Sequence, residues 1–324
     1  MDDFWRNKRV FVTGCTGHVG SWLTAELLAK GAHVVGLLRN HAVRPLLRQN
    51  NLISQIDVVH GDVRDYALLE QTLAHHEIDT IFHLAAQTLV GVANRVPLPT
   101  FETNIRGTWT LLEAARHNPT VQRVITASSD KAYGSHAELP YREDSPLLGA
   151  HPYDVSKSCA DLIARSYAHT YDLRVAVTRS ANLYGGGDLN WNRIVPGTMR
   201  SVLRGERPIL RSDGTMKRDY LFIKDVVRGY LTLAENMHRA DVCGEAFNFG
   251  ADHPVSALEM VETIIQLSNY PDLHPIILDE AHNEIQAQYL SVEKTRRVLG
   301  WQPCYSLEEG LQETIDWYAA YLGS

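Results

Sequence analysis

A tyrosine and a lysine lie four residues apart in the segment Tyr153-Asp154-Val155-Ser156-Lys157, at the start of a predicted helix. Residues at this spacing lie on one face of a helix, so the phenol and the ammonium should be neighbours. A nearby ammonium favours the phenolate and lowers the pKa of a tyrosine, which makes the phenol a usable base near neutral pH. The Y-x-x-x-K spacing is common by chance, and its surroundings decide what it means.

A glycine-rich segment supplies the first part of those surroundings. Residues 14–20 have the spacing G-x-x-G-x-x-G and lie between a predicted buried strand and a long predicted helix. In that setting glycines permit a tight turn and let main-chain N–H groups approach a pyrophosphate at the helix N-terminus. A plain glycine turn is the alternative, but the strand and helix on either side favour a dinucleotide site. The cofactor contacts expected in this loop are Gly14, Thr16, Gly17, His18, Val19 and Gly20.

The end of the second predicted strand bears on the choice between NAD and NADP. In NAD-selective sites an acidic residue about 20 positions after the loop bonds the ribose 2′-hydroxyl. The stretch 34–40 has no carboxylate, and Arg39 could meet a 2′-phosphate or be a solvated surface residue. NAD and NADP are therefore equally open as cofactors.

Two further strand ends complete the expected cofactor site. Asp62 and Val63 follow the third predicted strand, where the carboxylate could bond the adenine amino group or cap a helix. Small residues after the fourth strand would let a cofactor lie against the main chain, at the strand ends where parallel sheets bind ligands. The residues expected there are Leu84, Ala85 and Ala86.

Ser129 ends another predicted strand, upstream of Tyr153. It would hydrogen-bond the substrate hydroxyl whose proton Tyr153 removes, while a hydride passes from the same carbon to a nicotinamide. Tyr153 and Lys157 should lie against that cofactor as well. These residues together predict the oxidation of a carbinol.

Alternating strands and helices must bring these residues together. Short β-branched runs alternate with helical segments through the first 180 residues, which predicts βαβ units wound into a doubly wound parallel sheet of seven strands. Six of these strands are expected at 9–13, 33–38, 57–60, 80–84, 123–128 and 174–179, and helices at 21–30, 66–75, 101–117 and 153–170.

The sequence changes after Ser180, where LYGGGDLNWNRIVPG is too rich in glycine and polar residues for another βαβ unit. We therefore expect an α/β fold with a Rossmann-type NAD(P)-binding domain over 1–180 and a smaller C-terminal α/β substrate-binding domain over 181–324. Segments within about 219–250 should return to the first domain. Later helices are expected at 198–204, 225–235, 257–266, 292–299 and 307–321.

The composition limits the class of protein. A chain of 324 residues with 44% hydrophobic residues can bury a substantial core. The net charge of −7 and the scattered basic residues argue against a nucleic-acid partner. Four cysteines without a CxxC pair, the lack of a signal-like start and the lack of a long apolar run favour a cytoplasmic protein without a membrane span. The histidines show no metal-binding spacing, so no metal is expected.

Several motifs together resemble the pattern of the extended short-chain dehydrogenase/reductase superfamily over essentially the whole chain. They are the glycine loop, HLAAQ at 83–87, Ser129, Tyr153 and Lys157, followed by RSANLYG at 179–185, RDY at 218–220 and DV at 225–226. This resemblance implies an enzyme that acts on a nucleotide-diphosphate sugar. The C-terminal part of the chain would bind the nucleotide.

The resemblance also implies roles for individual residues. Guanidinium groups match phosphate geometry, so arginines are expected at the substrate diphosphate. The expected substrate contacts are Gln87, Ser129, Asn182, Arg193 and Arg218. Trp191 could stack on a base or cover its loop. Asn104 should support the active-site helix, and a homodimer should form through the helix at 101–117 and the Tyr153 helix.

The segment SSDKAYG at 128–134 indicates which branch of the superfamily the chain resembles. It is similar to the S-T-D-E-x-Y-G of sugar-nucleotide 4,6-dehydratases, and closer to the T-S-D-K of the CDP-glucose 4,6-dehydratase branch. The chain resembles this branch at 86–90, 185–188, 192–196 and 299–303, but departs from it near Arg218. GDP-mannose 4,6-dehydratases are similar at the end of the second strand. The nucleotide base and the hexose stay open, and both comparisons imply dehydration.

In such a reaction, oxidation at C4 acidifies the C5 proton, a base removes it, an acid protonates the leaving C6 hydroxyl, and the hydride returns to C6. Asp130 would be the acid. Lys131 takes the place of the usual glutamate and could be the base if it were partly neutral. It could also only orient Asp130 through an ion pair, or belong to a surface turn.

Two other functions stay open. A C4 epimerase would use Ser129, Tyr153 and Lys157 equally well. A catalytically silent nicotinamide-binding sensor or scaffold is the other, although the intact catalytic residues argue against it.

Overall fold

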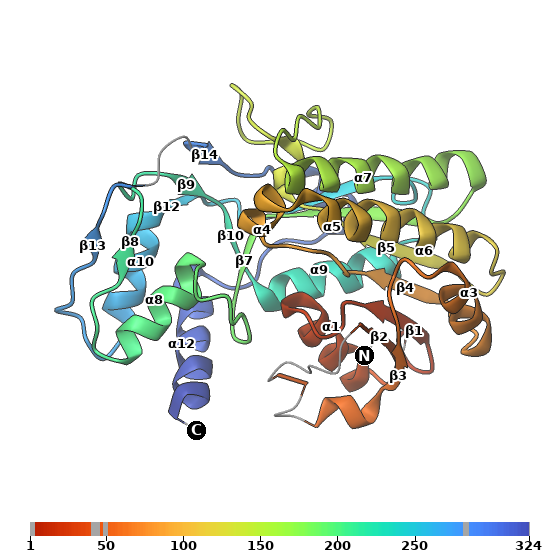
Figure 1. The fold of residues 1–324 in the computed structure, drawn as a ribbon, viewed down its shortest axis with the longest axis horizontal. Coiled ribbons are helices and arrows are strands. Elements are labelled where there is room, and N and C mark those ends of the chain that lie inside the picture. Colours follow the sequence, from red (N-terminus) through yellow and green to blue (C-terminus); the bar gives the residue numbers. More distant parts are fainter. Residues whose placement is uncertain (1–3, 40–45, 48–50, 281–284, 324) are drawn as a thin grey trace.

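The computed structural model describes residues 4–39, 46–47, 51–280 and 285–323. A parallel sheet of seven strands forms its centre, in the order β11-β6-β5-β4-β1-β2-β3 (Figure 1). Because the strand order reverses between β1 and β4, their carboxyl ends form the switch point where such sheets bind ligands. The strands are β1 (Arg9–Thr13), β2 (His33–Leu38), β3 (Asp57–His60), β4 (Thr80–His83), β5 (Arg123–Ala127), β6 (Val175–Ser180) and β11 (Ala246–Phe249).

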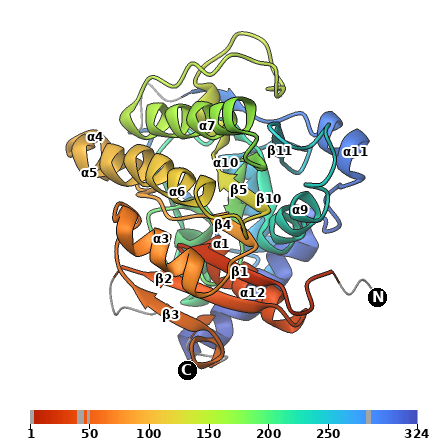
Figure 2. The same cartoon turned by 90° about the vertical axis from the view of Figure 1, so that its right-hand side faces the viewer.

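Helices cover both faces of this sheet. Helices α3 (Tyr66–His75), α6 (Gly107–Arg116) and α7 (Pro152–Tyr171) lie along one face, and α1 (His18–Ala29) and α9 (Ile223–Glu235) lie along the other (Figure 2). A strand covered on both faces is buried along its length, and β6 is buried at every position. The predicted α/β fold with a doubly wound parallel sheet is confirmed.

A smaller lobe lies to the left of the sheet in Figure 1. Its helices are α8 (Ile194–Leu203), α10 (Ala257–Leu267) and α12 (Leu307–Gly323). Short strands outside the large sheet form three small sheets: β7 (Asn182–Tyr184) with β10 (Tyr220–Phe222), β8 (Ile209–Leu210) with β13 (Ile276–Ile277), and β9 (Lys217–Arg218) between β12 (Val255–Ser256) and β14 (Ala287–Gln288). Helix α11 (Glu293–Leu299) contacts β11.

The helix expected at 101–117 is divided into consecutive pieces. After α4 (Val90–Arg95), the chain forms α5 (Pro97–Phe101), a π-helical turn (Glu102–Arg106) and α6. The π turn carries the buried Asn104, which accepts a hydrogen bond from the Gln87 N–H at 2.7 Å and donates to the Gln87 oxygen at 3.1 Å. The wider turn thus fixes the loop that follows β4, in keeping with the frequent use of π turns at functional sites.

The seventh strand comes from beyond residue 180. The chain first builds β7, α8 and the short strands of the smaller lobe, and then returns through α9 to β11. Strand β11 pairs with β6, with Ala246 opposite Val177. The two lobes are therefore not consecutive pieces of the chain.

Candidate active site

A cleft of about 1360 Å³ lies at the carboxyl ends of the strands, with walls from both lobes. Its lining includes every residue expected to hold the cofactor, from the glycine loop to Tyr153 and Lys157. It also includes Ser129, Asp130, Lys131, Asn182, Arg193 and Arg218. Residues that were singled out in separate motifs thus meet in one cavity.

The glycine loop has two positions where only glycine fits. Gly14 has a φ of 74°, and a Cβ there would lie 2.8 Å from the main-chain N of Ala85. A Cβ on Gly20 would lie 2.1 Å from the Gly14 oxygen. Helix α1 begins after Gly17, and no side chain of the described residues caps its first N–H groups. The loop therefore has the main-chain cradle that a dinucleotide pyrophosphate requires.

Arg39 and Asp62 lie at the ends of β2 and β3, where the cleft continues beyond the loop. The Asp62 carboxylate accepts hydrogen bonds from Arg64 at 2.8 and 3.0 Å, and these bonds hold the pKa of Asp62 below its usual value. Asp65, rather than Asp62, caps α3 by accepting from the Leu68 N–H. The alternative of Asp62 as a helix cap is therefore wrong. Arg39 is exposed at the rim.

A buried histidine shapes the end of β4. His83 Nδ1 lies 2.8 Å from Thr13 Oγ1, and its Nε2 lies 3.0 Å from Thr108 Oγ1. Burial lowers the pKa of His83 to about 3, so the ring is neutral. Thr13 Oγ1 also accepts from the N–H groups of Leu84 and Ala85, at 3.2 Å each. This network, which the sequence did not reveal, fixes the main chain against which a cofactor would lie.

Tyr153 and Lys157 lie on the buried side of α7, and the structure corrects one expectation about them. The Lys157 Nζ donates to the Ala127 oxygen at 2.8 Å, and burial lowers the pKa of Lys157 to about 8. Burial also raises the pKa of Tyr153; the charge of Asp130 adds to this, and a hydrogen bond with Ser129 opposes it. The predicted lowering of the Tyr153 pKa is wrong for the protein alone, because desolvation of the phenol dominates.

Asp130 and Lys131 begin a 3₁₀ turn (Asp130–Tyr133) directly after Ser129. Ser129 Oγ donates to Asp130 Oδ1 at 3.0 Å, and Lys131 Nζ lies 3.2 Å from Asp130 Oδ2. Asp130 is 1% exposed, which rules out the surface turn that the sequence left open. The turn also contacts Gln288, a residue that no sequence motif pointed to.

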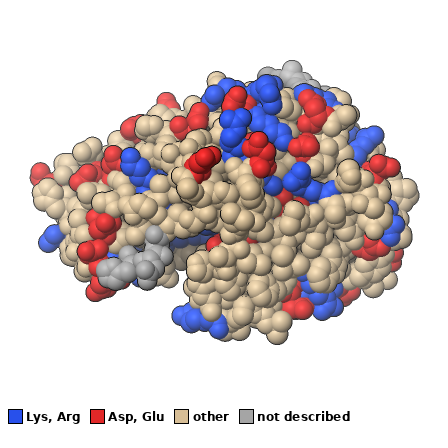
Figure 3. Space-filling view, turned by 90° about the horizontal axis from the view of Figure 1, so that it is seen from above, with Lys and Arg blue, Asp and Glu red and all other residues tan. Residues whose placement is uncertain are grey.

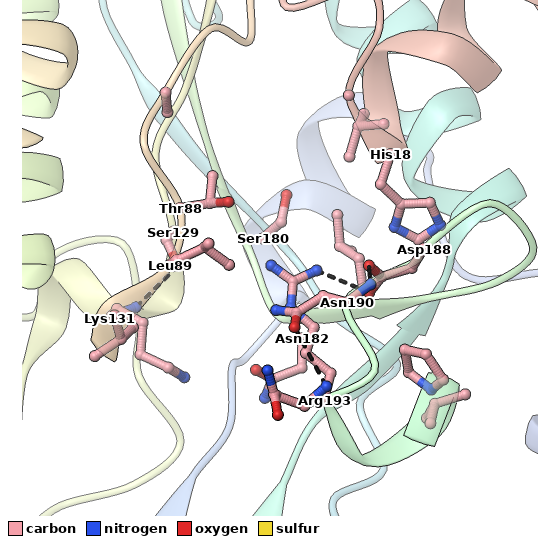
Figure 4. Close-up of a pocket in the computed structure, with 18 of the residues that line it drawn as sticks. His18, Thr88, Leu89, Ser129, Lys131, Ser180, Asn182, Asp188, Asn190 and Arg193 are labelled. Atoms are coloured by element: carbon pink, nitrogen blue, oxygen red, sulfur yellow. Dashed lines mark hydrogen bonds and ion pairs between the residues drawn. The ribbon is translucent and has the colours of Figure 1, made fainter. Parts of the chain in front are cut away.

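The opposite wall of the cleft carries the expected substrate contacts. Figure 4 shows Asn182 and Arg193 across from Ser129 and Lys131. Arg193 donates to the Asp188 carboxylate at 2.8 Å, and Arg218 also lines the cleft. Trp191 also lines the cleft, with the Arg200 guanidinium 5.2 Å from its ring.

Gln87 does not join these residues. Its side chain bonds within its own loop, to the main chain of Leu89, and donates to Thr100 Oγ1 at 3.2 Å. Gln87 is not among the described residues that line the cleft, so the expectation that its side chain binds substrate is not met here. Asn104 donates to Ser156 Oγ at 2.9 Å and thereby supports the Tyr153 helix, as the resemblance implies.

The rest of the described chain has few other features that suggest a ligand. Within the described ranges, no cluster of three His, Cys, Asp or Glu side chains is arranged to hold a metal ion. Nor does any helix in that part of the chain have the length and apolar character to cross a membrane. Lys and Arg are mixed with Asp and Glu over the face seen in Figure 3.

Comparison with known proteins gives consistent matches over the full length. A family model described as GDP-mannose 4,6 dehydratase matches residues 11–314. The chain is 31% identical to the CDP-glucose 4,6-dehydratase of Salmonella typhimurium, over 99% of this chain and 93% of that protein.

Solved structures match equally well. A dTDP-glucose 4,6-dehydratase from Streptomyces venezuelae, solved with NAD bound, has a TM-score of 0.85 at 29% identity, covering 97% of this chain and 98% of that one. A UDP-glucose 4-epimerase from Thermotoga maritima, solved with UDP-glucose, has a TM-score of 0.88 at 27% identity, covering 97% of this chain and 99% of that one. The fold is thus shared by dehydratases and epimerases, and only the site residues can separate the two reactions.

Proposed function

Because the chain belongs to the GDP-mannose 4,6-dehydratase family of the extended short-chain dehydrogenase/reductase superfamily, we propose that it is a nucleotide-diphosphate-sugar 4,6-dehydratase. The observation that carries this proposal is the Asp130 and Lys131 pair in the cleft beside Ser129. Carbinol oxidation needs only Ser129, Tyr153 and Lys157, whereas water elimination needs a further acid and base. Asp130 and Lys131 offer such an acid and base beside Ser129.

The reaction would convert a nucleotide-diphosphate hexose into its 4-keto-6-deoxy derivative. A nicotinamide cofactor bound at the glycine loop would supply the hydride-transfer chemistry, accepting from C4 and donating to C6. Ser129 holds the C4 hydroxyl, and Tyr153 takes its proton. A base removes the C5 proton, and Asp130 protonates the C6 hydroxyl, which leaves as water. C5 would regain a proton when C6 is reduced, so that the overall change to the sugar is the loss of water.

Lys131 fits both roles that the sequence left open. The Lys131 Nζ lies within 3.3 Å of both carboxylate oxygens of Asp130. The Lys131 side chain is 24% exposed. As a base it would receive the C5 proton, and as an orienting partner it would hold the Asp130 carboxyl toward C6.

The substrate diphosphate is proposed to lie between Arg193 and Arg218. Both arginines line the cleft, and guanidinium groups bind phosphate oxygens in bidentate geometry. The similar solved epimerase contains UDP-glucose, which supports a nucleotide-diphosphate sugar as the class of substrate.

The cofactor is proposed to be NAD or NADP, with Arg39 setting the balance. Arg39 lines the cleft at the end of β2, where an NAD-selective site would have a carboxylate. A guanidinium there favours a 2′-phosphate and cannot accept a hydrogen bond from a 2′-hydroxyl.

A homodimer is also proposed, through α6 and α7. Trp109 on α6 is 45% exposed and Leu162 on α7 is 57% exposed, while Leu98 on the neighbouring α5 is 67% exposed. Large apolar side chains gathered on adjacent helices are typical of an interface between subunits. Sedimentation analysis of the wild-type protein and of Leu162→Glu would test the dimer.

The direct test of the reaction uses purified protein, either nicotinamide cofactor and CDP, dTDP, GDP and UDP hexoses. A 4-keto-6-deoxy product detected by mass spectrometry from one of them is expected, with solvent deuterium at C5. A C4 epimerase, the alternative supported by the solved relative, would give an unlabelled 4-epimer. The proposal fails if no hexose yields the 4-keto-6-deoxy product.

A further inference from the structure

Gln288 lies 157 residues from Lys131 in the sequence, yet its side chain meets the catalytic turn. Its Oε1 accepts a hydrogen bond from Lys131 Nζ, and its Nε2 donates to the main-chain oxygen of Asp130 at 3.3 Å. Gln288 is 1% exposed. Both ends of a buried amide are thus bound to two successive residues of the turn.

This contact matters because a lysine side chain is long and flexible. The Asp130 carboxylate alone would allow Lys131 Nζ several positions around its two oxygens, which lie 3.2 and 3.3 Å away. The Gln288 oxygen adds a third acceptor outside the turn itself. Together the three acceptors define one position for the Nζ beside the carboxylate.

Gln288 also connects the turn to the strand that carries Arg218. Strand β14 runs parallel to β9, with Gln288 opposite Arg218, and the Asp219 N–H donates to the Gln288 oxygen at 3.3 Å. On the other side of the same segment, the Tyr141 N–H donates to the Tyr289 oxygen at 3.0 Å. The segment 286–291 therefore joins the substrate wall to the sheet lobe, as the course of β14 in Figure 1 indicates.

We propose that Gln288 is a positioning residue for the elimination step. It holds Lys131 Nζ against the Asp130 carboxylate and ties that pair to the strand of Arg218, a proposed substrate contact that lines the cleft. It does not serve the oxidation at C4, because its side-chain hydrogen bonds go to Asp130 and Lys131 and not to Ser129, Tyr153 or Lys157. This inference rests on the proposed dehydratase function.

The test compares two steps in Gln288→Met, which keeps the size of the side chain and removes its amide. Single-turnover absorbance reports reduction of the nicotinamide, and deuterium incorporation at C5 with product formation reports elimination. We expect nicotinamide reduction, KM and cofactor retention close to the wild-type values, and elimination slowed about tenfold, as for the loss of a hydrogen bond to a charged group.

A double-mutant cycle tests whether Gln288 acts through Lys131. If it does, Gln288→Met should add no further loss of elimination in a Lys131→Met background. Gln286→Met is the matched control, since Gln286 lies two residues away on the same segment and its side chain bonds Thr215 instead. It should behave as the wild-type protein.

Three results would overturn the role of Gln288. They are wild-type elimination in Gln288→Met, an equal loss of nicotinamide reduction and elimination, and independent losses from the two substitutions in the cycle. A wild-type protein that shows no elimination fails one step earlier and overturns the proposed function itself. Failure of the Gln288 role would thus be seen in the variants, and failure of the proposed function would be seen in the wild-type protein.

Discussion

The Arg193 guanidinium lies 2.8 Å from the carboxylate of Asp188, and both residues line the cleft. Asp188 is 2% exposed, and its other oxygen accepts from the Asn190 N–H at 3.1 Å. A guanidinium held in this way by one carboxylate presents its remaining N–H groups in a fixed direction. This contact would pre-orient Arg193 for the substrate diphosphate that is proposed to bind there.

This pair gives a prediction for substrate affinity. Asp188→Asn should raise the KM for the nucleotide sugar about tenfold and change kcat much less, because it removes a charge-assisted bond that orients a binding group. Steady-state kinetics would measure both constants. Asp272→Asn, an exposed residue outside the cleft, is the control and should leave them unchanged. A fall in kcat alone would contradict the binding role.

Asp130→Asn should separate the two halves of the proposed reaction. Loss of the general acid should slow product formation about a hundredfold. Nicotinamide reduction should persist, because the negative charge of Asp130 contributes to the raised pKa of Tyr153 and its removal makes the phenol easier to deprotonate. Rapid-mixing absorbance together with mass spectrometry of the product would show both effects. Equal loss of both steps would exclude the acid role.

The pKa of Lys157 predicts how activity depends on pH. Burial lowers this pKa to about 8, so the side chain is an ammonium below that value and becomes neutral as the pH rises through it. In the proposed reaction the ammonium would stabilise the phenolate that forms on Tyr153, and kcat/KM should therefore fall above about pH 8. A pH series of kcat/KM on the wild-type protein would measure this fall in activity at alkaline pH. Lys157→Met should have much lower activity, and its activity should not show this alkaline fall.

The glycine loop predicts unequal effects of two alanine substitutions. A Cβ on Gly20 would lie 2.1 Å from the Gly14 oxygen, whereas a Cβ on Gly17 would lie 3.1 Å from the same atom. Gly20→Ala should weaken cofactor binding more than about tenfold by displacing the loop, and Gly17→Ala should have a smaller effect. Titration calorimetry would measure the affinities, and circular dichroism would confirm folding. Similar cofactor affinities in the two variants would contradict the prediction that a side chain at position 20 displaces the loop.

Arg39 provides a test of cofactor choice. Arg39→Asp places an acceptor where a ribose 2′-hydroxyl would lie and repels a 2′-phosphate, so the ratio of NADP affinity to NAD affinity should fall more than about tenfold. Calorimetric Kd values for both cofactors give this ratio. Arg64→Ala is a useful comparison, because Arg64 binds Asp62 and does not line the cleft. An unchanged ratio in Arg39→Asp would place the guanidinium in solvent.

Much of the sheet lobe could be predicted from the sequence. The bounds of β1, β2, β3 and α3 agree with the predictions, because each is a short apolar or amphipathic run bounded by turn residues. The π turn at Asn104 within the predicted 101–117 helix could not be predicted, since Asn104 is held there by hydrogen bonds to Gln87, a residue outside this helix. Local propensity carries no information about such a partner.

The candidate site shows the same limit. Motif spacing brought together Ser129, Tyr153 and Lys157, which do line one cleft. It gave the wrong direction for the pKa of Tyr153, because spacing along a helix says nothing about how strongly the fold desolvates the phenol. Gln288 was missed because its contact with Lys131 spans 157 residues and no local pattern marks it.

Strand β11 has a consequence for how this protein can be divided. It closes the edge of the sheet beside β6, although the chain has by then built α8 and β9 of the other lobe. A fragment cut at residue 180 would leave the β6 edge bare, and bare edges promote aggregation. The smaller lobe is thus threaded through the cofactor-binding unit rather than appended to it. A chimera that borrows this lobe from a relative must be spliced at several junctions, with β11 and its pairing partner kept from the same parent.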